Sequence, residues 1–276
     1  MPDYKYETLL VEQDESVLTI TLNRPERLNA VDRVMHRELE EVFGEVSFDG
    51  SVSALVVTGA GRGFCSGGDV RSMDERGAAN VLEQRPMGAI SQSGRRILHN
   101  MLWVEQPIVC ALNGVAAGLG ATIALFCDII YASDQARIGD THVKAGLVAG
   151  DGGAVIWPLL VGVAKAKELL MTGDIIDAAE AERIGLVNKV VPNDQLMAEC
   201  MDLARRLANG PALAIRGTKH AINKKVWADL NMSLDVGLAM EERSSRHPDH
   251  SEAARSFVEK RTPEYKGTIY ALASIT

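Results

Sequence analysis

Two glycine-rich loops contain the residues of this chain that could do chemistry through their backbone alone. The first covers residues 64–70, which read FCSGGDV, and the second covers residues 113–120, which read NGVAAGLG. Each follows a run of strand-forming residues and precedes a predicted helix. A glycine lets backbone N–H groups approach a ligand closely, and the helix that follows adds the positive end of its dipole. Two such N–H groups converging on one oxygen would form an oxyanion hole; the alternative is a pair of tight strand-to-helix turns.

A dinucleotide-binding loop does not fit the glycines of the first region. Residues 59–63 read GAGRG directly after a strand-like run. The dinucleotide fingerprint needs a third glycine at position 64, where this chain has Phe64, and a helix that begins at once. The G-x-S-x-G motif of hydrolases is absent from the sequence. The sequence therefore predicts neither a dinucleotide site nor a hydrolase elbow.

The composition excludes several other classes of function. The 276 residues include 29 Lys and Arg against 37 Asp and Glu, a formal net charge of −8, so we expect no nucleic-acid partner. The four cysteines form no C-x-x-C pair, so we expect no metal site and a reduced, cytoplasmic setting. We expect no targeting peptide, since the first residues contain neither an apolar nor an Arg-rich stretch. The apolar run 108–127 is interrupted by Asn113 and by glycines, so we expect no membrane contact.

The spacing of apolar residues predicts strands that alternate with helices up to about residue 190. Predicted strands cover residues 6–11, 17–22, 54–58, 108–112, 129–132 and 136–138. Predicted helices cover residues 31–43, 87–103, 119–127, 164–172, 178–184, 195–208, 212–226 and 230–245. We therefore predict an α/β protein with a core over residues 1–192 and a helical C-terminal region over residues 193–276.

A series of motifs along the chain resembles one enzyme family. The motifs are residues 23–30 (NRPERLNA), 63–69 (GFCSGGD), 113–120, 127–132 (CDIIYA), 146–153, 178–191 and 257–261 (FVEKR). They occur in order between about residues 6 and 267, without a large gap. On these motifs the chain is similar to the enoyl-CoA hydratase/isomerase (crotonase) superfamily.

The resemblance implies a crotonase-like (ClpP/crotonase) fold, which is a spiral of repeated ββα units with a helical C-terminal trimerisation region. It implies a homotrimer or a hexamer. It also implies an acyl-CoA thioester as substrate and no cofactor, since coenzyme A arrives as part of the substrate. The acyl-CoA site would lie in the core, and residues 72–92 would shape the acyl pocket.

The resemblance also assigns roles to residues of the two loops. The oxyanion donors of the family correspond to the backbone N–H groups of Gly68 and Leu119. A thioester carbonyl becomes an enolate oxygen, and fixed dipoles stabilise that charge. The other substrate-binding residues that the resemblance implies for the coenzyme A and acyl parts are Arg24, Arg27, Leu28, Ser66, Gly67, Asp69, Val70, Thr122 and Lys260. Of these, Arg24, Arg27 and Lys260 are the cations for the phosphates, and Lys260 would reach a neighbouring subunit's site.

The chain departs from the family at two positions that matter for the reaction. Hydratases of this family carry two glutamates that hold and activate water. Thr122 stands at the position of one and His142 at the position of the other. The pair that adds water across a double bond is therefore missing from its usual places.

Asp151 and His142 are the candidates for the acid or base that remains. Asp151 falls where isomerase-type and dehalogenase-type relatives place a catalytic aspartate, and its alternative is a turn or helix cap before two glycines. His142 titrates near neutrality, and its alternative is an ordinary packed histidine. Asp140 is a weaker candidate. We expect an acyl-CoA enzyme of isomerase type, with a non-catalytic acyl-CoA-binding homologue as the alternative function.

Overall fold

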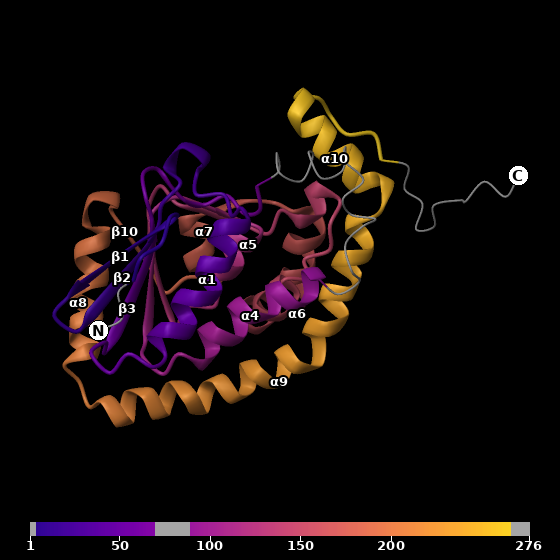
Figure 1. The fold of residues 1–276 in the computed structure, drawn as a ribbon. Helices are drawn as coiled ribbons and strands as arrows, with labels where there is room; N and C mark the ends of the chain where they lie inside the picture. The colour runs from indigo at the N-terminus through magenta and orange to yellow at the C-terminus, as the bar shows by residue number, and fades with distance from the viewer. Residues whose placement is uncertain (1–3, 70–88, 266–276) are drawn as a thin grey trace, which may run out of the picture.

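The computed structural model describes residues 4–69 and 89–265, and it consists of two β-sheets surrounded by helices (Figure 1). The larger sheet has the order β1-β2-β3-β5-β7-β10. Its strands are β1 (Leu9–Asp14), β2 (Val17–Leu22), β3 (Ala54–Gly59), β5 (Ile108–Leu112), β7 (Ile129–Ser133) and β10 (Lys189–Val191). The first two strands are antiparallel and form a hairpin, whereas the other neighbouring strands run parallel.

The smaller sheet has the order β4-β6-β8-β9. Its strands are β4 (Gly63–Cys65), β6 (Val115–Ala117), β8 (Arg137–Gly139) and β9 (Ile176–Asp177). The pairs β3 and β4, β5 and β6, and β7 and β8 each place one strand in the larger sheet and the next in the smaller one. Helix α5 (Leu119–Leu125) follows β6 directly. This repeat of two strands and a helix is the spiral that the resemblance implies.

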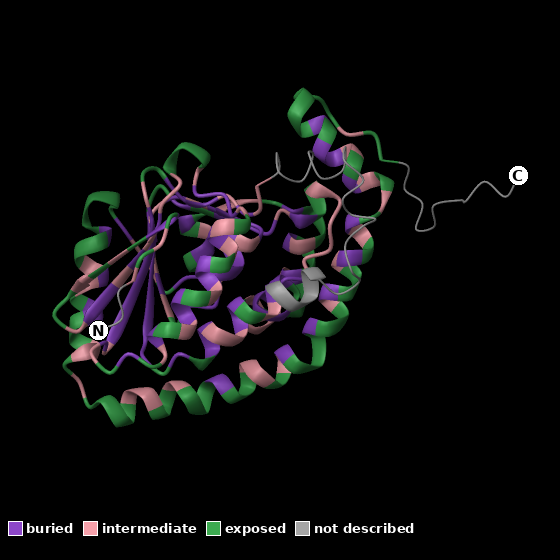
Figure 2. Cartoon of the chain, in the orientation of Figure 1, coloured by how far each residue is buried: buried purple, intermediate pink, exposed green. Residues whose placement is uncertain are grey.

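Helices cover both faces of the larger sheet. On one face, α8 (Leu196–Ala208) contacts β2, β3, β5 and β7. On the other, α1 (Arg33–Val46) and α4 (Ala89–Trp103) pack against each other and contribute Leu39, Phe43 and Leu98 to the main core. All six residues of β3 are consequently buried, as the purple strands of Figure 2 show. Burial on both faces explains why this strand reads as a continuous apolar run rather than an alternating one.

The other helices of the described residues lie in the second half of the chain. They are α6 (Gly153–Thr172), α7 (Ala178–Arg183), α9 (Ala212–Ser245) and α10 (Pro248–Glu259), and short 3-10 turns occur at η1 (Pro25–Arg27), η2 (His142–Ala145) and η3 (Asn193–Gln195). Helix α9 runs along one side of the molecule past α4 and α6 (Figure 1). Leu230, Leu234 and Leu238 are its buried apolar residues.

Several sequence predictions of single elements were wrong, and strands β9 and β10 and helix α10 were not predicted at all. Residues 212–245 form one helix of 34 residues instead of two, because Trp227-Ala228-Asp229 contains no residue that breaks a helix. Strands β4 and β6 lie within segments predicted to be loops, since three residues are too few to show a pattern. Helix α6 begins at Gly153 rather than at Ala164, and Gly162, with φ 78°, interrupts it.

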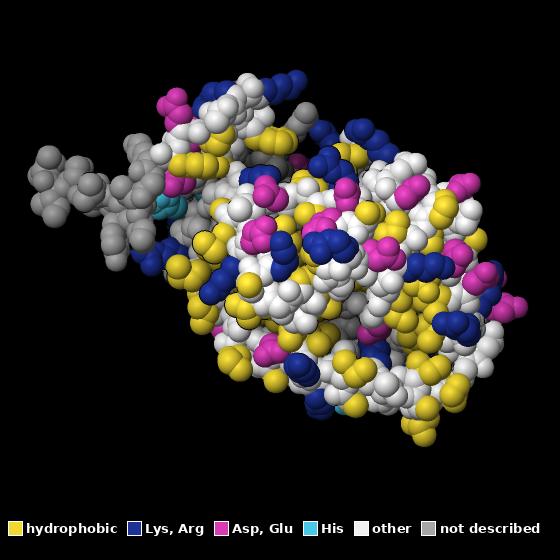
Figure 3. Space-filling model, turned by 180° about the vertical axis from the view of Figure 1, so that it is seen from behind, with side chains coloured by type: hydrophobic (Ala, Val, Ile, Leu, Met, Phe, Trp, Pro, Cys, Tyr) yellow, Lys and Arg dark blue, Asp and Glu magenta, His cyan; other side chains and the backbone are white. Residues whose placement is uncertain are grey.

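None of the helices in the described residues is long and apolar enough to cross a membrane. On the face shown in Figure 3, Lys and Arg side chains are interspersed with Asp and Glu side chains rather than gathered in one basic patch. That face therefore offers no stripe of positive charge for a nucleic-acid backbone.

Candidate active site

The two glycine-rich loops are in direct contact with each other. Gly67 has φ +89°, and a Cβ atom built on it would lie 2.7 Å from the carbonyl oxygen of Ala117. A Cβ atom on Gly120 would collide with the carbonyl oxygen of Cys65. Glycine is required at both positions, since any side chain would push the loops apart. This contact brings the backbone next to Gly67 close to the backbone next to Gly118.

Gly68 and Leu119, the predicted oxyanion donors, have N–H groups that the local structure does not use. Leu119 is the first residue of α5, where N–H groups have no partner within the helix. Gly68 forms a bridge with Val31: the N–H of Val31 donates to Gly67, and the N–H of Asp69 donates to Val31. That pattern leaves the N–H of Gly68 directed away from Val31. Convergence of the two N–H groups on one oxygen stays a prediction.

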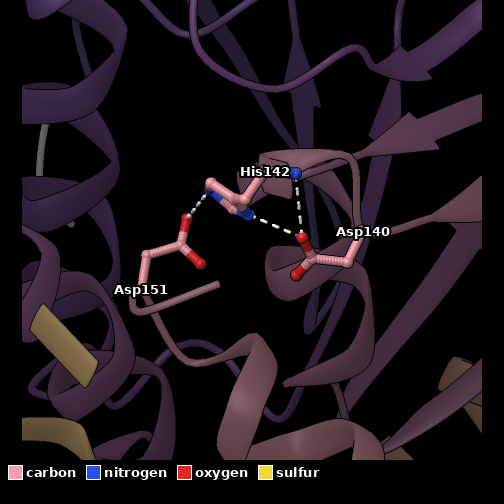
Figure 4. Close-up of side chains that lie close together, drawn as sticks. All are labelled: Asp140, His142 and Asp151. Carbon is pink, nitrogen blue, oxygen red and sulfur yellow. Dashed lines mark hydrogen bonds and ion pairs between the residues drawn. The ribbon is translucent and has the colours of Figure 1, made fainter. Parts of the chain in front are cut away.

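Three titratable side chains, from Asp140, His142 and Asp151, meet beside these loops (Figure 4). Asp140 follows β8, His142 begins η2, and Asp151 lies in the turn before α6. The Nδ1 atom of His142 lies 2.7 Å from Oδ1 of Asp140, and its Nε2 atom lies 3.1 Å from Oδ2 of Asp151. Both ring nitrogens therefore face carboxyl groups. Interpreting His142 as an ordinary packed histidine does not account for this arrangement.

Two glycines fix the turn that presents Asp151. Gly152 has φ +112°, which glycine adopts far more readily than other residues. Gly153 starts α6, and a Cβ atom there would collide with Oδ2 of Asp140. The GG pair thus bends the chain after Asp151 and makes room for the carboxyl group of Asp140.

Thr122 holds Asp151 from the opposite side. Its hydroxyl, on α5, donates to Oδ1 of Asp151 at 3.2 Å. Thr122 lies three residues after Leu119, so one turn of α5 connects a predicted oxyanion donor to the side chain that contacts Asp151. Thr122, which the resemblance places at the position of a family glutamate, thus contacts the predicted acid or base.

The charges of the three side chains depend on one another. Burial alone would raise the pKa of Asp151, but the charge of His142 and the hydrogen bonds it accepts outweigh burial and lower its pKa. Burial alone would lower the pKa of His142, but Asp151 and Asp140 outweigh burial and hold its pKa well above the ordinary value. At neutral pH, Asp151 is ionised and His142 is protonated.

These three residues also form the group within the described residues whose donor atoms come close enough to hold a metal ion, since the atoms lie within 4.8 Å of one another. Both nitrogens of His142 are already engaged by carboxyl oxygens. A metal ion at this position would have to replace these hydrogen bonds. The expected absence of a metal stays a prediction.

The predicted coenzyme A residues of the N-terminal part gather against the first loop. The N–H of Ser66 donates to the carbonyl of Leu28 at 3.0 Å, and its hydroxyl lies 3.4 Å from the carbonyl oxygen of Arg27. Arg27 is exposed. The structure therefore brings these two segments together, as the resemblance implies.

Arg24 is engaged in a structural role in the same region. Its guanidinium pairs with Asp32 at 3.2 Å and with Asp69 at 3.3 Å, and it donates to the carbonyl of Ala30. These contacts tie the loop after β2 to the first glycine-rich loop. The role of Arg24 as a cation for a phosphate stays a prediction.

The other predicted residues lie apart from this cluster or outside the described residues. Lys260 is exposed at the position that follows α10, with φ 56°. Val70 and residues 72–88 of the predicted acyl-pocket segment lie outside the described residues. Cys65 is fully buried, and burial raises its pKa to about 12, in keeping with a packing role.

Glu241 of α9 is an ionisable residue near the cluster that the sequence analysis missed. Its Oε2 atom is inaccessible to solvent and has no hydrogen-bond partner within residues 4–69 and 89–265. The signal in the sequence was Gly237, a glycine inside a helix four residues before Glu241, which indicates a close approach of another segment.

Comparison with known proteins shows the family. The model of the enoyl-CoA hydratase/isomerase family matches residues 12–268. The chain belongs to the enoyl-CoA hydratase/isomerase family. This confirms the resemblance, and it makes the protein an enzyme of the lyase or isomerase class.

The chain is similar to one family member that is named an isomerase and to others that are named hydratases. It is 35% identical to the 1,2-epoxyphenylacetyl-CoA isomerase of Escherichia coli over 95% of this chain and 99% of that protein. It is 36% identical to the short-chain-enoyl-CoA hydratase of Clostridium acetobutylicum over 93% of this chain and 96% of that one. The crystal structure of an enoyl-CoA hydratase/isomerase from Mycobacterium paratuberculosis matches with a TM-score of 0.85 and 35% identity, covering 92% and 100% of the two chains. The predicted crotonase-like α/β fold is confirmed.

Proposed function

We propose that this family member acts on an acyl-CoA thioester and moves a proton between carbons of the acyl group, as an isomerase does. One observation supports this more than any other: Thr122 and His142 both contact a buried aspartate, Asp151. By the resemblance, Thr122 and His142 stand at the two positions where hydratases have glutamates. Moving a proton within an enolate needs one base at the α carbon, whereas adding water needs a pair of groups that hold the water.

The proposed reaction starts at the thioester carbonyl. Its oxygen binds the N–H groups of Gly68 and Leu119, which stabilise the negative charge that develops there. The carboxylate of Asp151 removes a proton from the α carbon, and the electron pair of the C–H bond moves into the enolate. A proton then adds at the γ carbon, so that the double bond shifts and the number of atoms is unchanged.

In this proposal His142 is a positioning residue rather than the base. Both of its nitrogens are engaged, and its raised pKa keeps it protonated at neutral pH. A protonated imidazole has no lone pair with which to take a proton. Asp140 orients the ring, and the positive charge of His142 keeps Asp151 ionised.

The alternative of a non-catalytic acyl-CoA-binding protein fits the cluster less well. Burying three titratable groups together carries a desolvation cost that an apolar core would avoid. Asp140 is 0% exposed and Asp151 7% exposed, which is a costly arrangement for a merely structural turn.

The proposal is tested by the ratio of two activities. We expect isomerisation of a 3-enoyl-CoA to exceed hydration of crotonyl-CoA by the same protein. Rapid hydration of crotonyl-CoA would show that the missing glutamates do not decide the reaction.

We further propose a homotrimer or hexamer in the cytoplasm. Apolar side chains of α9 and α10 remain exposed on the single chain, among them Ile222, Met232, Val236 and Phe257. Contact between subunits through these helices would remove that apolar surface from water.

A further inference from the structure

Helix α9 packs against the turn that carries Asp151. A Cβ atom on Gly150 would collide with the carbonyl oxygen of Gly237 and would lie 2.8 Å from Cβ of Glu241. One turn further along the helix, the hydroxyl of Ser244 accepts a hydrogen bond from the N–H of Val148 at 3.1 Å. Residues 237, 241 and 244 share one face of a helix, since their spacings are four and three residues. Glu241 therefore lies on the face of α9 that packs against the Asp151 turn.

The carboxyl group of Glu241 is buried with one of its oxygens unpaired. Among the residues that the structure describes, its Oε2 atom has no hydrogen-bond partner, and it is inaccessible to solvent. A buried polar atom left in this state costs stability, so it calls for an explanation in the function of the protein. Burial raises the pKa of Glu241 to about 8, and the charges of Asp151 and Asp140 raise it while that of His142 lowers it. Glu241 is thus protonated at neutral pH, when Asp151 is ionised.

We propose that Glu241 is the second carboxyl group of the acid/base site and supplies the proton that the γ carbon takes up. This inference rests on the proposed function. Asp151 takes the α proton and becomes neutral, and the enolate forms. Glu241 gives its proton to the γ carbon and becomes a carboxylate. Transfer of the proton from Asp151 to Glu241, directly or through a water molecule, then restores both groups, so that protons and charges balance.

The experiment compares Glu241→Gln with Glu242→Gln. Glutamine keeps the size of the side chain but has no acidic proton. Glu242 is the neighbouring residue and pairs with Arg246 at 3.0 Å, so its variant controls for loss of a carboxyl group on the same helix. For each protein the measurements are isomerisation of a 3-enoyl-CoA, exchange of the α hydrogens with deuterium in D2O, and binding of an acyl-CoA.

We expect Glu241→Gln to bind acyl-CoA and to exchange α hydrogens as the wild type does, while isomerisation falls ~10²-fold or more, in the range for loss of a general acid or base. Glu242→Gln should keep both activities. Isomerisation by Glu241→Gln at the wild-type rate would overturn the proposal, and so would loss of exchange together with isomerisation. The variant Asp151→Asn tests the proposed function separately from the role of Glu241. If Asp151→Asn still exchanged α hydrogens, the role of Asp151 as the base would be contradicted.

Discussion

The Nε2 atom of His142 lies 3.1 Å from Oδ2 of Asp151, and this contact joins η2 to the turn before α6. The two residues are nine positions apart, and the charge of each shifts the pKa of the other, that of Asp151 downward and that of His142 upward. A positive charge held in place by the fold keeps the proposed base ionised in a buried setting.

Replacement of Asp151 by asparagine should remove the base without changing its size. We expect acyl-CoA binding to be retained and isomerisation to fall ~10²–10⁴-fold, the range for loss of a general base. Steady-state kinetics and equilibrium binding would check this. Full activity in Asp151→Asn would contradict the assignment of Asp151 as the base, and full activity in both Asp151→Asn and His142→Gln would exclude the whole cluster.

Replacement of His142 by glutamine should change the pH dependence of the reaction. His142 lowers the pKa of Asp151, so its removal raises that pKa, and the rise of kcat/KM with pH should begin at a higher pH than in the wild type. A pH profile that does not move would contradict the coupling of the two residues.

The same variant should change the pH dependence of stability. Because the pKa of His142 is raised on folding, its stabilising contribution is full below the ordinary value of 6.5 and is lost as the pH rises through the folded-state pKa, well above 6.5. Melting temperatures of the two proteins should therefore differ most below pH 6.5.

Replacement of Gly68 by proline should remove one proposed oxyanion donor, because proline has no N–H. We expect kcat to fall ~10²–10³-fold, as for other losses of a single donor. Gly68→Ala keeps the N–H and serves as the control, and it should lose much less activity. Similar losses in both variants would indicate damage to the loop rather than loss of a donor.

Alanine variants of Arg24 and Arg27 should distinguish an arginine that stabilises the fold from one that binds acyl-CoA. Arg24→Ala removes the ion pairs with Asp32 and Asp69, so it should lower the free energy of unfolding by about 1–3 kcal/mol and lower the melting temperature. Arg27 is exposed, so Arg27→Ala should leave stability unchanged and weaken acyl-CoA binding. Thermal melts combined with binding measurements would show the reverse pattern if the two roles were exchanged.

The state of association should be a multiple of three. Light scattering of the purified protein should give the mass of a trimer or a hexamer. A stable monomer or dimer would contradict the proposed covering of α9 and α10.

The sequence predicted the parts of the fold that extend over many residues. The continuous run of β3 and the helical spacing of α1 depend on local pattern, and both elements were found within a few residues. The three-residue strands β4 and β6 escaped prediction because their pairing partners lie about 50 residues apart in the chain. Motif resemblance, rather than periodicity, supplied the overall spiral.

Site residues could be predicted from the sequence where they belong to a motif. Those that reach the site only through the packing of helices could not be predicted. Asp151 and His142 occupy motif positions, so each was a candidate, but their contact depends on the turn at Gly152 and Gly153. Glu241 lies 90 residues after Asp151, on a helix whose register against the core cannot be read from the spacing of apolar residues alone.

The contact between the two glycine-rich loops would make the reactivity of the proposed site independent of its choice of substrate. At Gly67 and Gly120 the loops approach each other too closely for a side chain at either glycine. The place where a carbonyl oxygen would bind is then set by backbone geometry, which substitutions of neighbouring side chains leave in place. Residues around the acyl group can accordingly change the size and shape of the accepted substrate while the electrophilic end of the pocket stays the same.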